Sequence, residues 1–197
     1  MPRLTRTESQ SRNRELLVAS ARRLFLRDGY AATSLAAVAA EAGFSTGVVY
    51  SNVAGKADLA LLVLREIQAE QIAALEAALE AGARPEDKLD AFVGWAEAAL
   101  GGGWPQLELE FALDARSDPR LVAEEAERHD AARDLAERAL AHLVPPELAP
   151  MVPTGAVAEA LVNLVIGVSV RRLIDPSVTY DSMLGPLRDL LRAVAPA

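Results

Sequence analysis

Hydrophobic residues recur along most of this 197-residue chain at the spacing of one helical face. In the segment from Arg12 to Asp28, for example, Leu17, Ala21 and Leu24 form one stripe, and arginines lie opposite it. No segment bounded by turn residues alternates apolar and polar positions as a half-buried strand does. The pattern therefore predicts an all-α protein of about nine helices, without an internal repeat.

Serine, glycine and proline residues mark where these helices begin and end. Ser34 and Ser45 suit N-cap positions, while Gly29 and Gly43 suit the positions just beyond a helix C-terminus. The helix 56–81 is expected to be the only continuous element that joins the N-terminal part to the rest. The predicted helices are 12–28, 35–42, 46–51, 56–81, 86–100, 105–115, 119–143, 154–174 and 181–194.

Two short helices, 35–42 and 46–51, are separated by a turn that contains Gly43, which is the pattern of a helix-turn-helix. Such a unit places its second helix in the major groove of DNA. Gly47 lets the backbone approach a phosphate, because a Cβ atom there would hold it away. The sequence therefore predicts an N-terminal head that reads double-stranded DNA.

The side chains around this second helix suit two kinds of DNA contact. Val48 and Ser51 are small enough to approach base edges, and Tyr50 offers a hydroxyl to phosphate. Lys56 lies in the first turn of the next helix, where free backbone N–H groups also favour an anion. We therefore expect base contacts from the short helix and phosphate contacts beside it.

Charge is distributed unevenly along the chain. The net charge is −8, yet the segment through Lys56 holds eight basic and four acidic residues, and the remainder holds 12 basic and 24 acidic residues. This asymmetry favours an anion-binding head, 1–56, on an acidic body, 57–197. An N-terminal arm with Arg3, Arg6 and Arg12 either adds minor-groove contacts or is a solvated tail.

The stretch LFLRDGYAATSLAAVAAEAGFSTGVVYSNVAGKADL, 24–59, resembles the DNA-binding segment of TetR-type transcriptional regulators. The resemblance implies a homodimer with a three-helix DNA-binding head and a divergent helical body that binds an effector. Val53, Ala36 and Thr46 depart from the family pattern, so we expect fewer direct hydrogen bonds to bases. The expected DNA-binding residues are Ser34, Ser45, Thr46, Gly47, Val48, Tyr50, Ser51 and Lys56.

Candidate effector contacts lie in the body. The stretch 107–140 weakly resembles effector domains of one TetR-type branch, and Trp104, Glu108 and Phe111 share a helical stripe there. A carboxylate among aromatic side chains suits a cationic or hydroxyl-bearing effector; the alternative is that Glu108 is a rim residue that pairs with an arginine. Trp95 and Trp104 either line such a pocket or belong to the core.

The helix 154–174 is apolar around nearly its whole circumference and contains Asn163. We expect this asparagine to be buried against the body, a partner subunit or both, because a buried amide requires hydrogen bonds. It then fixes the register of a dimer or contacts the effector. The helices 154–174 and 181–194 together suit a homodimer interface.

Other classes of function receive less support. The chain contains no cysteine, signal peptide or span of apolar residues long enough for a membrane, so we expect a cytoplasmic location. A carboxylate metal site in a helical bundle uses Glu-x-x-His motifs, but Ala126 and Ala139 precede His129 and His142. We expect no catalytic residue, metal or cofactor. A helical adaptor without DNA binding is the other alternative. The sequence does not identify the effector, the operator or the regulated genes, nor whether the effector releases DNA or promotes binding.

Overall fold

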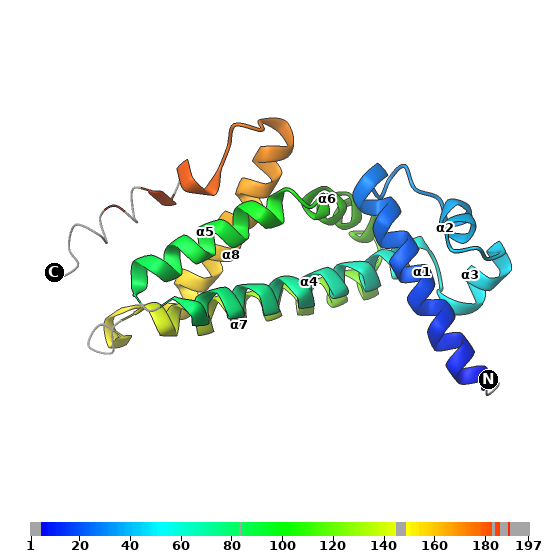
Figure 1. Ribbon diagram of the computed structural model, residues 1–197, viewed down its shortest axis with the longest axis horizontal. Coiled ribbons are helices and arrows are strands. Elements are labelled where there is room, and N and C mark those ends of the chain that lie inside the picture. The colour runs from blue at the N-terminus through cyan, green and yellow to red at the C-terminus, as the bar shows by residue number, and fades with distance from the viewer. Residues whose placement is uncertain (1–4, 83, 145–148, 183, 186–188, 190–197) are drawn as a thin grey trace. The chain divides into compact units, whose positions relative to one another are not determined.

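The structure is a computed structural model that describes residues 5–82, 84–144, 149–182, 184, 185 and 189. Within these ranges the chain forms helices and no strand, which confirms the predicted all-α class (Figure 1). The helices are α1 (Arg6–Asp28), α2 (Leu35–Glu41), α3 (Thr46–Asn52), α4 (Lys56–Ala81), α5 (Pro85–Leu100), α6 (Trp104–Ala115), α7 (Pro119–Leu143), a 3₁₀ turn (Ala149–Met151) and α8 (Thr154–Ile174).

Most predicted boundaries hold to within one or two residues, but the start of α1 does not. This helix begins at Arg6 rather than near residue 12, because Thr5 and Glu8 form a capping box at its N-terminus. Arg6 and Arg12 are therefore helical, and the predicted basic arm is not an extended tail at these positions. The predicted helix 181–194 falls largely outside the described residues; positions 181, 182, 184, 185 and 189 are helical.

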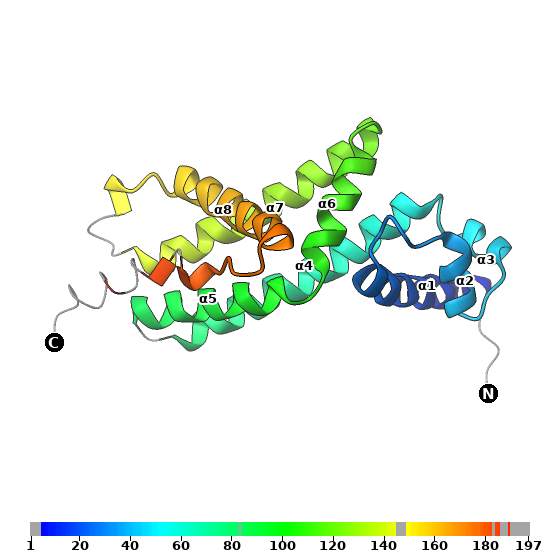
Figure 2. The ribbon, with the colours of Figure 1, turned by 90° about the horizontal axis from the view of Figure 1, so that it is seen from above.

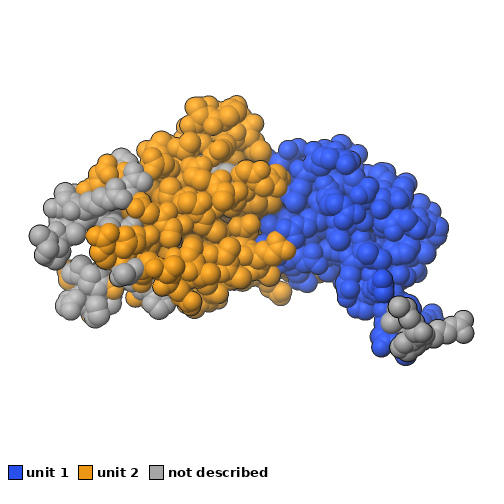
Figure 3. All heavy atoms as spheres, in the orientation of Figure 1, with its two compact units in different colours: residues 1–67, 106–122 blue, residues 68–105, 123–197 orange. Residues whose placement is uncertain are grey.

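The chain divides into two compact units, coloured separately in Figure 3. The first unit, called the head from here on, comprises 1–67 and 106–122; the second, the body, comprises 68–105 and 123–197. Three helices, α4, α6 and α7, contribute residues to both units. The expectation that α4 is the only continuous connection is therefore wrong. A functional division at residue 56 stays a prediction.

The head is built on the apolar stripe of α1. Leu17, Leu24 and Phe25 are at most 5% exposed, and α1 contacts both α2 and α3. Val38 of α2 and Val49 of α3 are fully buried, so each short helix is held by a core side chain. Since isolated helices of seven residues are unstable in water, tertiary packing maintains α2 and α3.

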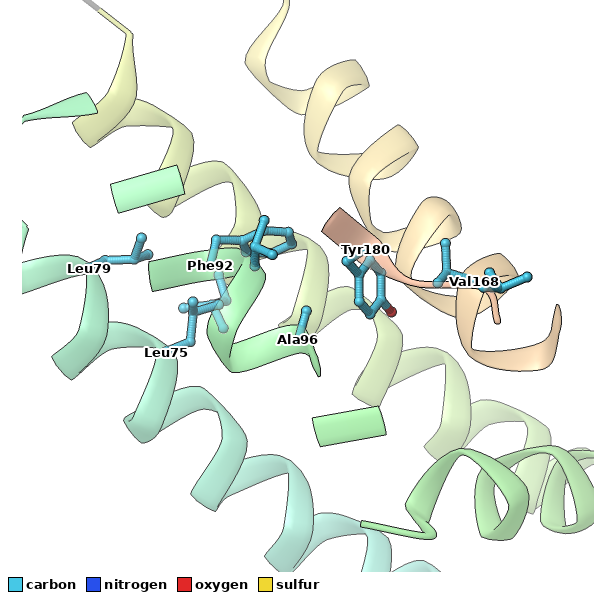
Figure 4. Close-up of a cluster of buried hydrophobic side chains, with 9 residues drawn as sticks. Leu75, Leu79, Phe92, Ala96, Val168 and Tyr180 are labelled. Atoms are coloured by element: carbon cyan, nitrogen blue, oxygen red, sulfur yellow. The ribbon is translucent and has the colours of Figure 1, made fainter. Parts of the chain in front are cut away.

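The body has its own apolar cluster, shown in Figure 4. Tyr180, which follows α8, is 1% exposed and donates a hydrogen bond from its hydroxyl to the carbonyl of Val165 at 2.8 Å. Its backbone N–H donates to Glu97 of α5, which also accepts from Arg172 of α8. These bonds fasten α8 and the segment after it to α5. The cluster contains Leu75, Leu79, Phe92, Val93, Ala96, Leu135, Val168, Val178 and Tyr180.

Among the described residues, no single helix is long and apolar enough to cross a membrane. The pair α3 and α4, bent by 66° at the break between them, passes that test together by length and composition alone.

Candidate nucleic-acid interface

The turn between α2 and α3 has the local chemistry that the sequence predicts. Ser34 caps α2, since its hydroxyl accepts a hydrogen bond from the N–H of Ala37 at 3.1 Å. Gly43 follows α2 with a backbone φ of +72°, a conformation that residues with a Cβ atom rarely adopt. The N–H of Phe44 then donates to the carbonyl of Ala39 at 2.8 Å and closes the turn. These contacts fix the direction in which α3 leaves the turn.

The outer face of α3 carries most of the predicted DNA contacts. Val49 anchors the helix, and Tyr50 beside it is 65% exposed. Val48 is only half-buried, and its neighbour Gly47 has no close contact where a Cβ would stand. Ser45, Thr46, Gly47 and Ser51 are exposed as well. This short helix thus presents a row of small and polar groups with one aromatic hydroxyl.

Two side chains hold the C-terminal end of α3. The hydroxyl of Ser51 and the amide of Asn52 both donate to the carbonyl of Val48, at 2.8 and 2.7 Å. Ser45 occupies the N-cap position of α3, as predicted, but it does not cap the helix through its side chain. Its backbone carbonyl accepts from Val48, while its hydroxyl forms no capping hydrogen bond. The hydroxyl is therefore not committed to the helix end.

The ammonium group of Lys56 already makes two contacts within its own chain. Its Nζ lies 4.1 Å from the centre of the Tyr30 ring and donates to the carbonyl of Ala31 at 3.3 Å. Burial lowers the pKa of this ammonium group, while the nearby Asp114 and Glu110 carboxylates act in the opposite direction. An ammonium group has three donors, so a phosphate contact by Lys56 stays compatible with this position and stays a prediction.

A set of contacts that the sequence did not reveal fastens α6 to the loop after α1. Tyr30 donates its hydroxyl to Asp114, and the N–H of Ala31 donates to Glu110 at 2.7 Å. Burial and the Asp114 carboxylate both raise the pKa of the Tyr30 hydroxyl. The Tyr30 ring also meets Phe111 edge-on, with centroids 6.1 Å apart. The Gly-Tyr pair at 29–30 is conspicuous in the sequence, but its partners lie about 80 residues away.

Gly29 makes this loop possible. Its φ is +88°, and a Cβ there would stand 2.9 Å from Nε2 of Gln106 on α6. The carbonyl of Gly29 also accepts from the hydroxyl of Thr33 at 2.8 Å. The loop is therefore fixed on both sides before α2 begins.

The predicted effector contacts are divided between the two units. Trp95 belongs to the core of the body: it packs on Phe92 and donates its indole N–H to the carbonyl of Gln71 at 3.1 Å. Phe111 is fully buried beside Tyr30 in the head. Glu108 is half-buried on α6. The indole N–H of Trp104 is buried and has no hydrogen-bond partner within the described part of the chain.

Asn163 is exposed in the isolated chain, so the body of its own subunit does not bury it. Its amide donates to Glu159 on the same helix at 3.2 Å. Ala156, Ala160 and Gly167 lie exposed along the same stripe of α8. The half-buried Leu161 and Leu164 and the buried Val168 pack instead against the cluster of the body.

The geometry of α1 to α3 is that of a helix-turn-helix DNA-binding unit, and residues 17–63 match the family model of the bacterial regulatory proteins of the TetR family. The multidrug binding protein EbrR, solved with imidazole, is 26% identical over 100% of this chain and 98% of its own, with a TM-score of 0.67. A TetR-family regulator from Agrobacterium tumefaciens is 18% identical over 91% and 97%, with a TM-score of 0.69.

A candidate transcriptional regulator from Saccharomonospora viridis, solved in complex with choline, is 18% identical over 92% of this chain and 96% of its own, with a TM-score of 0.69. No curated protein is significantly similar to the chain. The fold and the head define a DNA-binding transcriptional regulator, which the comparisons favour over a helical adaptor. Residues 17–63 thus carry the DNA-binding segment of the TetR family of bacterial regulators, and the chain has the fold of solved TetR-family regulators.

Proposed function

We propose that the protein is a repressor that binds a palindromic operator as a homodimer and is released from it by a small organic effector. The observation that carries the dimer is the uncovered face of α8. Ile166 is 38% exposed and borders the small, exposed residues Ala156, Ala160 and Gly167, among which Glu159 and Asn163 are also exposed. A second copy of the same helix is the occupant that fits a face made largely of small residues, because a two-fold contact brings the same surface of each subunit together.

Gly167 supports a close approach of two such helices. A glycine within a helix is less favourable than alanine by about 1 kcal/mol. In this chain a Cβ at Gly167 would meet nothing within 4 Å, so packing inside the subunit does not require the glycine. A partner helix passing over this position would require it. In that arrangement Asn163 is buried between the subunits and its amide fixes their register.

On DNA, the exposed groups in α3 and beside it take two roles. Tyr50 and Lys56 contact phosphates, and Ser34 and Ser45 position the backbone of the turn beside them. Thr46 and Ser51 contact base edges, and Val48 meets thymine methyl groups where Gly47 allows close approach. Because α3 contains no charged residue, sequence preference rests on few direct bonds and on the shape of the site. A regulator of chromosomal DNA acts in the cytoplasm.

The effector is proposed to be a small organic amine. The similar EbrR was solved with imidazole and the Saccharomonospora protein with choline, both of which are small nitrogen compounds. In this chain the indole N–H of Trp104 has no hydrogen-bond partner within the described residues and suits a ligand acceptor such as a hydroxyl. Glu108, four residues further along α6, supplies negative charge for a cation.

Effector binding reaches DNA through α4 and α6. Both helices contribute residues to the head and to the body, and α6 holds the loop at Tyr30 and Ala31 through Asp114 and Glu110. An effector that binds the DNA-free state more tightly weakens operator binding, and the operator weakens effector binding by the same factor. Couplings of about 1–3 kcal/mol are typical and correspond to roughly 5–150-fold.

Selection of binding sites from a random duplex library, followed by light scattering of the complex, tests this function. We expect a palindromic site whose half-sites are one helical turn apart, about 34–36 Å, occupied by two chains. Choline and imidazole are then titrated by calorimetry with and without that duplex, and we expect weaker binding in its presence. A monomer at micromolar concentration with no selected site would contradict the proposal. Equal affinities in the two titrations would show that the effector does not regulate DNA binding.

A further inference from the structure

The positive charge of the head is not located on α3. That helix, Thr46–Asn52, has no charged residue, although phosphate neutralisation supplies most non-specific affinity for DNA. Of the basic residues that flank it in the sequence, Arg23 pairs with Glu41, and Arg27 pairs with Asp28. Lys56 contacts the Tyr30 ring and the Ala31 carbonyl. The charges that attract DNA must therefore come mainly from elsewhere in the head.

The first turns of α1 carry arginines of a different kind. Arg6, Arg12 and Arg14 are exposed and form no hydrogen bond or ion pair in the part of the chain that the structure describes. They lie in the segment Arg6–Leu16, called the α1 overhang, which precedes the first core residue, Leu17. None of the overhang residues is buried. The overhang is about 16 Å long at 1.5 Å per residue.

The overhang is a helix although the described part of the chain buries none of its residues. A helix that is polar on all sides is stabilised by side-chain pairs or by an external partner. The capping box supplies the local part: the N–H of Thr5 donates to Glu8 at 2.7 Å, and the N–H of Glu8 donates to the Thr5 hydroxyl at 3.3 Å. Because these side chains already occupy the helix end, a partner would bind along the face of the overhang rather than at its N-terminus.

Helical periodicity separates the overhang arginines into two faces. Arg14, Gln10 and Arg6 stand three, seven and 11 residues before Leu17, so they prolong the buried stripe of α1. That stripe packs on α2 and α3. Arg12 stands two residues before Arg14, which places it about 160° away around the helix. Arg6 and Arg14 thus face the side of the head on which α3 lies, and Arg12 faces away.

The ribbon views agree with this placement. In both Figure 1 and Figure 2 the dark blue first turns of α1 lie at the end of the head that carries α3, and in Figure 1 they extend past it. A duplex held against the exposed face of α3 therefore continues alongside the overhang. Its phosphates are the anions that two unpaired guanidinium groups on one stripe would bind.

We infer that the α1 overhang is a second DNA-contacting surface, on which Arg6 and Arg14 bind the phosphate backbone beside the groove that α3 enters. This inference deepens the DNA-binding function and rests on it. The overhang supplies charge-driven, sequence-independent affinity, whereas α3 supplies the sequence preference. Gln10, between the two arginines, is placed to donate to the same strand.

The test compares Arg14→Gln with Arg12→Gln, two changes of equal charge at exposed, unpaired positions on opposite faces. Binding to a fluorescein-labelled random duplex of roughly 30 base pairs is measured by anisotropy between about 50 and 200 mM salt. Log affinity falls as log salt rises, and each lost phosphate contact makes this slope shallower by about 0.9. A dimer carries the substitution twice, so Arg14→Gln should make the slope shallower by about 1.8. The loss of affinity between about 50 and 200 mM salt should therefore be about tenfold smaller for Arg14→Gln than for the wild type.

Arg12→Gln should leave the slope nearly unchanged, Arg6→Gln should resemble Arg14→Gln, and Arg14→Lys should restore the slope. Circular dichroism of each variant confirms that the helices are retained. Equal slopes for Arg12→Gln and Arg14→Gln, or an unchanged slope for Arg6→Gln/Arg14→Gln, would overturn the inference while DNA binding itself persists. A wild-type protein that fails to bind the duplex at about 50 mM salt would instead contradict the DNA-binding function.

Discussion

Two helices of this regulator leave a face uncovered, and the faces are chemically opposite. The α1 overhang is polar except for Leu16 at its end, and it carries three arginines that form no pair among the described residues. The uncovered face of α8 carries small residues, Ala156, Ala160 and Gly167, with the exposed Ile166 at its edge. A polar face with unpaired charge suits a polyanion, because an apolar partner would leave the arginines without compensation. An apolar face with small residues suits a copy of itself. The same protein thus separates DNA attraction from subunit association.

The largest effect is expected on dimerisation, when a charged residue is introduced on the uncovered face of α8. Ile166→Glu places a carboxylate in the proposed dimer interface, and an unpaired buried charge costs about 3–5 kcal/mol. Since each factor of ten corresponds to about 1.4 kcal/mol, the dimer dissociation constant should rise by more than about a hundredfold. Sedimentation velocity should show monomers, and binding to the palindromic site should fall with it.

Leu113→Glu is the matched control for this change. Leu113 is also a large apolar residue, 55% exposed, but it lies on α6 rather than on the proposed interface helix. This variant should remain dimeric. If Ile166→Glu also stays dimeric at micromolar concentration, the uncovered face of α8 is not the interface.

An intermediate effect is expected from two helix caps, one within the packed head and one on the overhang. Ser34→Ala removes the cap of α2 and should lower the free energy of unfolding by about 1 kcal/mol, measured in urea. Thr5→Ala removes the cap of α1 but should leave global stability nearly unchanged, because the overhang supports no core residue. Hydrogen exchange should instead show faster exchange at residues 6–9. Equal losses of global stability in the two variants would mean that the overhang folds as part of the head core.

The smallest effect is expected at low pH, where the first turn of α1 should lose part of its stability. Hydrogen bonds from the backbone and hydroxyl of Thr5 lower the pKa of Glu8 in the folded protein. Its stabilising contribution is therefore present above the unfolded pKa of about 4.3 and is lost as the pH falls through the lower folded value. We expect the NMR amide signals of residues 6–9 to show fraying in that acidic range, while those of α2 do not. Unchanged signals through the titration would contradict the assigned role of Glu8.

The sequence predicted most of the fold because its helices carry strong local signals. Apolar periodicity and the glycines at helix ends placed α2 to α8, and the Ser34 cap formed as expected. The start of α1 was missed because the first apolar residue after Thr5 is Leu16, so periodicity gives no signal there. The Thr5–Glu8 spacing is a capping-box signature, however, and it could have indicated the earlier start.

The site was predictable where neighbours in sequence are neighbours in space. The exposure of Thr46, Gly47 and Tyr50 on a short helix follows from its local pattern. The partners of Tyr30 were not predictable in this way, since Asp114 and Glu110 are brought to it by the tertiary fold. For Asn163 the isolated chain excludes burial by its own body, and burial by a partner subunit stays a prediction, because periodicity cannot distinguish a face that packs on its own chain from one left for a second chain.

The bonds between α6 and the Gly29–Ala31 loop bear on how this regulator can be re-engineered. A chimera that grafts residues 1–67 alone onto a foreign sensor would leave Tyr30 without Asp114 and Phe111, and Ala31 without Glu110. The transplantable cassette is discontinuous: it comprises 1–67 together with the strip 106–122, which lies about forty residues further along the chain. A chimera should therefore fold when residues 106–122 are transferred together with residues 1–67 of the same head. It should fail when the two proteins are joined at a single junction after residue 67.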